Sequence, residues 1–298
     1  ATILNLRIRE AYLKNKTPIF SIGNPGNLTY PYDLLESNTN MIKDIIENKH
    51  ELSNKIINAK KPIIIFGQSS LKIDSSPYIF EEFKKFLIKN DKINKDWNSL
   101  NVLSTNASTV GSYDLDILSS KNEKNITLEK VKNNQFKIIF LFGQDDLKFK
   151  KSNEFIIYIG SHGDRGSEIA NIILPGAAYT EQDGFYTNLE GKVQKAYKAS
   201  YPPGDAKEDW QIINELSALI KRKKLFDSKD ELINSMFNYL KLKKDITIQD
   251  LPIYDFFKEN IFIEEIDYYH SNAIARASKT MYECKNIKTN LKKTGTEG

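Results

Sequence analysis

Short apolar runs alternate with amphipathic stretches over the first two thirds of the chain. Five of these runs are rich in isoleucine and phenylalanine, and most end in glycine, which is typical of strands buried on both faces. The predicted strands are Pro18–Gly23, Pro62–Gly67, Lys137–Gly143, Phe155–Gly160 and the shorter Asn171–Leu174. Helical patterns lie between them, at Asn40–Asn48, His50–Ala59 and Ser76–Lys89, with Trp97–Leu103 as a further candidate. Strands alternating with helices predict an α/β fold with a parallel sheet flanked by helices.

The pattern changes after Gly176. Residues 179–194 look like a loop, in which Asp183-Gly184 and Glu190-Gly191 predict tight turns around a short extended segment, Phe185–Leu189. The last third of the chain predicts three more helices, at Asp205–Lys221, Asp230–Leu240 and Ser271–Cys284, the last with Ser271 as its N-cap.

The change of pattern also suggests a division of the chain. We expect an α/β domain over residues 1–222 and a helical, irregular C-terminal region over residues 223–298, in which the mixed residues 241–270 wrap across the surface. In the predicted helix Asp205–Lys221, four apolar side chains share one face: Trp210, Ile213, Leu216 and Ile220. We interpret the basic run Lys221–Lys224 as a solvated helix C-terminus, where positive charge favours the helix dipole.

Composition excludes several classes of protein. With 298 residues, the chain is long enough to bury a large core without disulfides, and one cysteine rules out an intrachain disulfide or a cysteine-rich metal site. The longest apolar runs, such as Ile138–Gly143, are too short to span a membrane, and Ala1–Glu10 has no apolar signal core. The sequence therefore predicts a soluble globular protein from a reducing compartment.

Charge adds two points. The net charge of +4 is mild and the basic residues are spread out, whereas a nucleic-acid binder would be expected to concentrate them on one stripe, so no nucleic-acid partner is expected. The chain has 38 lysines and only five arginines. Where lysine is the default, an arginine marks a position that needs a planar, bidentate guanidinium. The five are Arg7, Arg9, Arg165, Arg222 and Arg276.

Known catalytic patterns are missing. The three histidines lie far apart, and Gly160–Gly166 (sequence GSHGDRG) is either a ligand-binding loop at the end of a strand or, as we favour, a tight turn that needs glycine. We interpret Cys284 as a core residue, and the adjacent carboxylates Glu81/Glu82 and Asp145/Asp146 as solvated surface groups. We therefore predict no catalytic, cofactor-binding or metal-binding residue in this chain.

One run of residues resembles a known family. Asn171–Glu181 continued by Gly184–Gln194 is similar to a segment of the molybdopterin oxidoreductase superfamily and, within it, of the large (75 kDa) iron–sulfur subunits of respiratory complex I. Four further segments resemble the same family in the right order: Leu6–Arg9, Asn27–Asp33, Tyr201–Gly204 with Glu208–Trp210, and Ser271–Met281. Three of the arginines fall on family arginines, Arg7, Arg9 and Arg276, whereas Lys192 stands where the family usually has arginine.

The resemblance implies a fold and a role. It implies a molybdopterin-oxidoreductase-like α/β fold without the molybdenum cofactor, in the C-terminal part of the subunit. The family's iron–sulfur clusters need many cysteines, so they are expected in a separate N-terminal half, as a split gene or a processed chain would produce. The implied partners are that half and other subunits of the peripheral arm, on the matrix side of the mitochondrial inner membrane. The implied role is structural support for electron transfer from NADH to ubiquinone.

Two other functions stay open at this point. The chain is alternatively a fragment of a catalytic molybdopterin oxidoreductase of the formate dehydrogenase type, or a free-standing α/β protein that binds a ligand at Gly160–Gly166. If the chain begins within a module, its apolar opening residues belong to an exposed seam that another polypeptide covers, with Arg7 and Arg9 beside it. These residues are Ile3, Leu4, Leu6 and Ile8.

Overall fold

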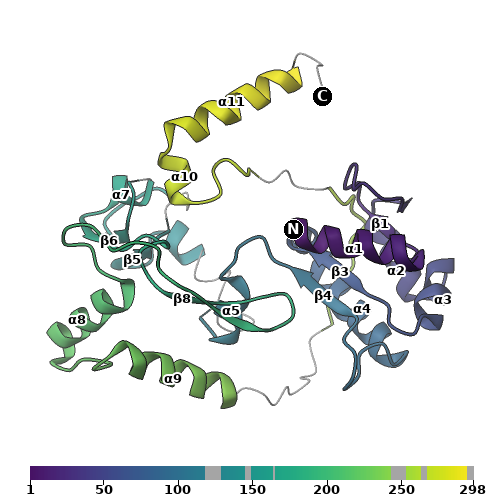
Figure 1. Cartoon of the computed structure of the whole chain (residues 1–298), viewed down its shortest axis with the longest axis horizontal. Coiled ribbons are helices and arrows are strands. Elements are labelled where there is room, and N and C mark those ends of the chain that lie inside the picture. The colour runs from purple at the N-terminus through teal and green to yellow at the C-terminus, as the bar shows by residue number, and fades with distance from the viewer. Residues whose placement is uncertain (118–128, 145–148, 164, 243–252, 263–266, 294–298) are drawn as a thin grey trace. The chain divides into compact units, whose positions relative to one another are not determined.

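The computed structural model describes residues 1–117, 129–144, 149–163, 165–242, 253–262 and 267–293 (Figure 1). Contacts within the chain divide it into two compact units. Unit 1 comprises Ala1–Asn106 with Ile248–Glu265, and unit 2 comprises Ala107–Thr247 with Ile266–Gly298. The expected domain boundary after residue 222 does not coincide with this division by contacts, and it stays a prediction. None of the helices in the described residues is long and apolar enough to cross a membrane.

Unit 1 contains two pairs of parallel strands. Strand β1 (Phe20–Ile22) pairs with β2 (Asp33–Leu35), and β3 (Ile64–Gly67) pairs with β4 (Leu100–Leu103). The 3₁₀ turn η1 (Gln68–Leu71) follows β3 directly. The helices of unit 1 are α1 (Thr2–Asn15), α2 (Thr39–Ile46), α3 (Glu51–Asn58) and α4 (Ser76–Lys89).

The core of unit 1 lies where α2, α3 and α4 pack on β3. Helix α4 contributes more buried side chains to it than any other element, because Ile79, Phe83, Phe86 and Leu87 all lie on its buried face, as the apolar spacing predicts. The ring of Phe66 on β3 meets that of Phe83 edge to face, with 5.8 Å between the centroids. The other buried members of this core are Ile42, Ile45, Leu52, Ile56 and Ile261.

A distant segment closes unit 1. Residues 253–262 return to it, and Phe257 and Glu259 bond to two fully buried hydroxyl groups near the starts of α2 and α4. The Thr39 hydroxyl donates to Phe257 O (2.8 Å) and accepts from Glu259 N (2.9 Å). The Ser75 hydroxyl donates to Phe257 O (2.6 Å) and accepts from Phe257 N (2.7 Å). The Glu259 carboxylate accepts from Ser75 N (2.9 Å), so this segment also satisfies a backbone N–H at the beginning of α4.

Unit 2 is built on a three-stranded parallel sheet. Its strands β5 (Ile138–Phe142), β6 (Phe155–Gly160) and β7 (Ile172–Pro175) pair in that order, with the short helix α7 (Arg165–Ile169) between β6 and β7. The predicted parallel strands and flanking helices are thereby confirmed. The expectation that these strands are buried on both faces is wrong for β5, because burial alternates along it and Ile138, Phe140 and Phe142 are exposed. One face of the sheet is buried by a second core made of Val131, Ile139, Leu141, Ile156 and Tyr158.

Helices and a hairpin complete unit 2. Helix α5 (Thr109–Asp114) precedes the sheet, and the antiparallel hairpin β8 (Gly184–Thr187) and β9 (Val193–Ala196) follows it. Helices α8 (Asp209–Lys221), α9 (Lys229–Leu242), α10 (Ala273–Ala277) and α11 (Lys279–Lys293) complete the described part of the unit (Figure 1).

Three local predictions are wrong. Residues 100–103 form strand β4, because they pair in parallel with β3, and not a helix. Ser271 does not cap one long helix. Instead Asn272 caps α10 by accepting from Ala275 N (2.9 Å), and the extended backbone at Ser278 separates α10 from α11. Residues 179–194 are not a simple loop, since they contain β8 and the beginning of β9.

Candidate functional site

The carboxyl edge of the β5–β6–β7 sheet is where an α/β protein usually binds a ligand. At this edge the ring of Tyr158 occupies the space that two glycines leave open. A Cβ atom at Gly160 would lie 2.5 Å from the Tyr158 hydroxyl oxygen, and one at Gly166 would lie 2.8 Å from the same ring. The Tyr158 hydroxyl donates to His162 O (3.0 Å). Tyr158 thus takes the space beside both glycines, and at Gly166 the backbone oxygen of Gln144 would also lie 2.6 Å from an added Cβ. Neither glycine has a positive φ, so they are needed for space and not, as predicted, for a backbone conformation that favours glycine.

The remaining polar groups of that loop are few among the described residues. The Ser161 hydroxyl lies 2.9 Å from Nδ1 of His162, and both side chains belong to the turn that follows β6. Asp164 and the carboxylate pair Asp145/Asp146 lie outside the described residues. Whether this loop binds a ligand therefore stays open.

A half-buried carboxylate lies next to the same edge. Lys207 forms a parallel bridge to Gly176, just beyond β7, and this bridge brings the first turn of α8 against the sheet. A Cβ at Gly176 would lie 3.1 Å from Oδ1 of Asp209. Burial, followed by the neighbouring Glu208, raises the pKa of the Asp209 carboxyl above its usual value of 3.8. The charge of Asp209 is therefore costly at this edge. The residue lies in the segment Glu208–Trp210 that resembles the family, but nothing in the sequence indicated its burial.

The beginning of α8 is also tied to the hairpin region by charge. Nζ of Lys229 lies 2.5 Å from the Glu208 carboxylate and 3.7 Å from that of Asp183. The Asp183 carboxylate accepts from Lys198 N (2.9 Å), and this hydrogen bond lowers the pKa of the Asp183 carboxyl. The indole of Trp210 donates to Glu208 (2.9 Å). Each carboxylate here is bound to a structural partner, so this network holds the fold together and offers no free base.

The hairpin itself partly matches the expectation for residues 183–191. Gly191 has a φ of 76°, which confirms the second predicted turn. Asn188 closes that turn by accepting from Glu190 N (3.0 Å) and Lys192 N (2.9 Å). Gly184, by contrast, is the first residue of β8 and pairs with Ala196, so the first predicted turn is not formed there. The extended segment ends at Thr187 and does not reach Leu189.

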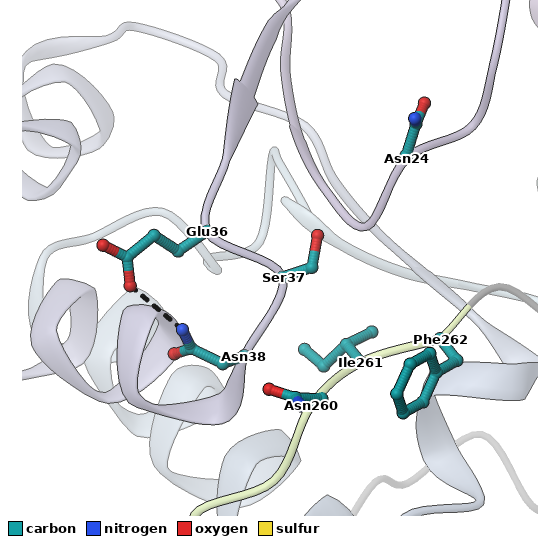
Figure 2. A pocket seen from close by; sticks show the side chains of 7 residues that line it. All are labelled: Asn24, Glu36, Ser37, Asn38, Asn260, Ile261 and Phe262. Carbon is teal, nitrogen blue, oxygen red and sulfur yellow. Dashed lines mark hydrogen bonds between the residues drawn. The ribbon is translucent and has the colours of Figure 1, made fainter.

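Unit 1 has an open hollow of about 690 Å³, which is lined by Asn24, Glu36, Ser37, Asn38, Asn260, Ile261 and Phe262 (Figure 2). Several of the polar side chains that line it form hydrogen bonds within unit 1. Asn38 donates to the Glu36 carboxylate (3.0 Å) and accepts from Met41 N (2.9 Å), which caps α2. Ser37 accepts from Gly23 N (3.1 Å) through its hydroxyl. Figure 2 shows Glu36 turned toward Asn38, so among the described residues the hollow contains no carboxylate paired with a nucleophile or a base.

Metal-ligand clusters and nucleophiles are not found where the structure describes the chain. No group of three or more His, Cys, Asp or Glu side chains in those ranges is close enough to hold a metal ion. Cys284 is half-buried on α11, so it is less deeply buried than a core residue. Glu81 and Glu82 form (i,i+3) ion pairs with Lys84 and Lys85 on α4. The Glu81 side chain is only 17% exposed, so it is less solvated than predicted.

Helix α1 is the least buried helix of unit 1. None of its residues is buried, although Ile3 and Leu6 are apolar and are 71% and 51% exposed. The guanidinium of Arg7 lies 3.4 Å from the Glu10 carboxylate in an exposed pair, and Arg9 is exposed too. One polar contact to the rest of unit 1 is made by Asn5, which accepts from the Tyr30 hydroxyl (2.7 Å). Exposed apolar side chains on a helix with so little cover present a surface that suits a partner.

Comparison with known proteins identifies the family. A family model described as molybdopterin oxidoreductase matches residues 1–219. The chain belongs to the molybdopterin oxidoreductase family. Membership confirms the resemblance seen at Asn171–Gln194, and the parallel sheets of both units agree with an α/β fold of this family.

Several curated members of the family are similar along nearly the whole chain. The NADH-ubiquinone oxidoreductase 75 kDa subunit of Reclinomonas americana is 36% identical over 301 residues, which cover 96% of this chain and 43% of that protein. An NADH-quinone oxidoreductase subunit of Rickettsia bellii is 33% identical, over 99% of this chain and 43% of that protein. Its counterpart in Rickettsia conorii is 32% identical, over 95% and 42%. The chain spans less than half the length of these relatives.

The family name implies a molybdopterin, which carries phosphate. Phosphate groups are usually held by free backbone N–H groups, helix N-termini and basic side chains. At the carboxyl edge of β5–β6–β7, the ring of Tyr158 fills the space beside Gly160 and Gly166, and the Asp209 carboxylate lies beside Gly176. The described residues of this edge therefore do not fit an anionic cofactor. That the chain carries no cofactor stays a prediction.

Proposed function

We propose that this chain is the cluster-free, C-terminal part of the large subunit of a respiratory NADH:ubiquinone oxidoreductase, complex I. The observation that carries the proposal is the similarity along 95–99% of the chain to proteins named as subunits of NADH-ubiquinone or NADH-quinone oxidoreductase. In this role the chain performs no chemistry of its own. It supports the cluster-bearing half of the subunit and its neighbours in the peripheral arm, on the matrix side of the mitochondrial inner membrane.

Two features of the molecule support a structural role. The single cysteine, Cys284, is not enough to ligate an iron–sulfur cluster, which takes four protein ligands. The apolar residues Ile3 and Leu6 of α1 are exposed, as is expected of a seam that another polypeptide covers. This chain matches only 42–43% of each relative, and the proposal assigns the cover of this seam to the part that corresponds to the rest of their length.

The test is the assembly in which the chain occurs. Complex I is purified from the cells that make the chain, and its subunits are identified by native mass spectrometry. We expect this chain to be present together with a second, cysteine-rich polypeptide that corresponds to the remainder of the relatives. The isolated chain is expected to contain no iron and no molybdenum by elemental analysis. Bound pterin or molybdenum would favour a catalytic molybdopterin oxidoreductase, and a monomer in native gels would favour a free-standing ligand-binding protein.

A further inference from the structure

Helix α8 has an apolar face that nothing in the described part of the chain covers. Ile213 and Ile220 lie on the same side of the helix, and Leu219 is next to them. Leu219 is 81% exposed and Ile220 is 70% exposed. Ile212 lies two turns before Leu219, on the same side of the helix, but it is buried, as is Asn214. Helix α8 is therefore anchored near its beginning and uncovered near its end. Figure 1 shows α8 followed by α9 in unit 2. The C-terminal half of α8 therefore presents aliphatic side chains to the solvent.

Four consecutive cations extend this face. Residues Lys221–Lys224 are all exposed, and no salt bridge between described residues involves any of their side chains. The nearby carboxylate of Glu215 does not neutralise them, because both of its oxygens accept from Nζ of Lys207 (2.8 Å). Positive charge at a helix C-terminus is favourable to the helix dipole, so the run is stable in solvent, and it also presents four cations to an opposite charge on another polypeptide.

The basic run is held in one conformation. Arg222 ends α8 in the left-handed region, with a φ of 56°, and turns the chain back along the helix. Asn214 holds the returning chain, since its Oδ1 accepts from Leu225 N (2.7 Å) and Phe226 N (3.1 Å). The Ser217 hydroxyl donates to Lys223 O (3.0 Å). The turn is thus a built feature rather than a frayed end, and it places the half-exposed Leu225 next to the cations.

We propose that this surface docks an acidic amphipathic segment of a neighbouring polypeptide. We call it the α8 patch, and it consists of Ile213, Leu219, Ile220, Lys221, Arg222, Lys223, Lys224 and Leu225. Aliphatic side chains of the partner cover the centre, and its Asp and Glu side chains face the four cations at one end. The proposal rests on the proposed function, because it assigns one contact surface to a subunit of a larger assembly.

Charge complementarity favours a protein over a lipid surface. The cations are bounded by acidic residues of the same unit, with Glu215 on one side and Asp227, Asp230 and Glu231 on the other. An anionic membrane presents negative charge uniformly and would repel these neighbours, whereas a polypeptide can place each sign where it is needed. The patch also contains no aromatic side chain on which a nucleic-acid base would stack. A partner segment with acidic and aliphatic residues fits both properties.

The first experiment reverses the charge of the patch. The triple variant Lys221→Glu/Lys223→Glu/Lys224→Glu is compared with Lys60→Glu/Lys89→Glu/Lys95→Glu, which changes the net charge equally at exposed lysines of unit 1. Both are measured by the amount of chain that co-purifies with the assembly, with pulse proteolysis as the check on folding. We expect the amount of the patch variant that co-purifies to be at least about tenfold lower than that of wild type, and the amount of the control variant to match wild type. Equal recovery of the two variants would overturn the proposal.

The second experiment identifies what covers the patch and does not depend on the stability of the charge variant. A photo-crosslinking amino acid replaces Leu219 in the otherwise wild-type chain, and the linked peptide is sequenced from the purified assembly. We expect a peptide of another polypeptide that contains several Asp or Glu residues among aliphatic ones. A link to a second copy of this chain, to its own residues or to lipid would contradict the inference. So would binding of the isolated chain to vesicles of phosphatidylcholine and phosphatidylserine that the patch variant abolishes.

The two proposals fail in different ways. If the wild-type chain is absent from complex I, the proposed function and the α8 patch fail together. If the wild-type chain is present, but reversing the patch has no effect and Leu219 links to no acidic peptide, only the patch fails.

Discussion

At the scale of single residues, Tyr158 decides how the loop after β6 is built. Its side chain is 2% exposed and occupies the space that Gly160 and Gly166 leave, and its hydroxyl group binds the loop through His162 O. A tyrosine buried at the carboxyl edge of a sheet takes up volume that a ligand would otherwise use. Tyr158 therefore crowds two of the three glycines of this loop, Gly160 and Gly166, and it also accounts for the poor fit of this edge to a cofactor.

A substitution pair within the loop tests this account. Gly160→Ala places a Cβ 2.5 Å from the Tyr158 hydroxyl oxygen, so the ring or the strand has to move, and we expect a loss of about 1–3 kcal/mol of stability. Gly163→Ala is the matched control, because its Cβ would meet only Ser167 Oγ at 3.6 Å, an ordinary contact. Pulse proteolysis in urea measures both. If the two variants unfold at the same urea concentration, Tyr158 does not set the need for glycine.

Asp209 gives a prediction about pH. Because burial raises the pKa of its carboxyl in the folded state, the folded protein binds that proton more tightly than the unfolded chain does. The ionised carboxylate therefore lowers stability at pH values above the raised pKa, and this cost disappears as the pH falls below the ordinary value of 3.8. We expect Asp209→Asn to be more stable than wild type at neutral pH, with a difference that vanishes near pH ~3. A difference that grows on acidification would contradict the assignment.

At the scale of elements, residues 253–262 join structure that is distant in sequence. Thr39 and Ser75, both fully buried, lie near the beginnings of α2 and α4, and each forms a pair of hydrogen bonds with the returning segment. A hydroxyl group is suited to this position because it donates and accepts at once. The segment therefore acts as a strap that fixes the N-terminal ends of two helices.

Removing a hydroxyl group that binds the strap should loosen the strap. Ser75→Ala deletes two partly buried hydrogen bonds to Phe257 N and O, so we expect a loss of about 1–2 kcal/mol from unit 1. Hydrogen exchange should rise in residues 253–262 and at the beginning of α4. Ser200→Ala is the control, since Ser200 is exposed and lies in unit 2, away from the strap. Unchanged exchange in the strap would show that the hydroxyl does not hold it.

At the scale of the whole molecule, the exposed apolar surface matters most. Ile3 and Leu6 on α1 and Leu219 and Ile220 on α8 are large, apolar and exposed, and α1 has no buried residue. Single exposed apolar residues are common, but clusters of them mark interaction surfaces. The chain matches less than half of its relatives' length, so the proposed remainder of the subunit offers a partner for such surfaces.

Association through α1 can be tested directly. Arg7 and Arg9 are exposed beside Ile3 and Leu6, and we expect Arg7→Ala/Arg9→Ala to weaken association with the other half of the subunit by roughly 2–5 kcal/mol, because a carboxylate of the partner is left buried and unpaired. Co-purification of the two halves of the subunit measures this loss of association. We also expect the isolated chain to be unstable or insoluble. A wild-type chain that is monodisperse and stable alone would show that α1 has no partner.

Local patterns in the sequence are enough to place most of the elements. The predicted bounds of Phe155–Gly160 and Ser76–Lys89 agree with β6 and α4, because a short apolar run and a helical apolar stripe are recorded in neighbouring residues. The helix predicted at Trp97–Leu103 is wrong for the opposite reason: Leu100–Leu103 form a strand because they pair with β3, which is 36 residues earlier in the chain. The hairpin of β8 and β9 is not predicted because its strands are short and carry mixed side chains.

The sequence by itself determined the family, the parallel α/β class and the lack of any catalytic pattern, since each of these depends on residue types and on their order along the chain. Only the tertiary structure decided which groups meet. It placed Tyr158 against Gly160 and Gly166, brought Asp209 beside Gly176 and returned residues 253–262 to Thr39 and Ser75. It also left α1 and the end of α8 exposed. Burial and hydrogen bonding depend on distance in space, and residues far apart in sequence carry no local mark of the partners they will have.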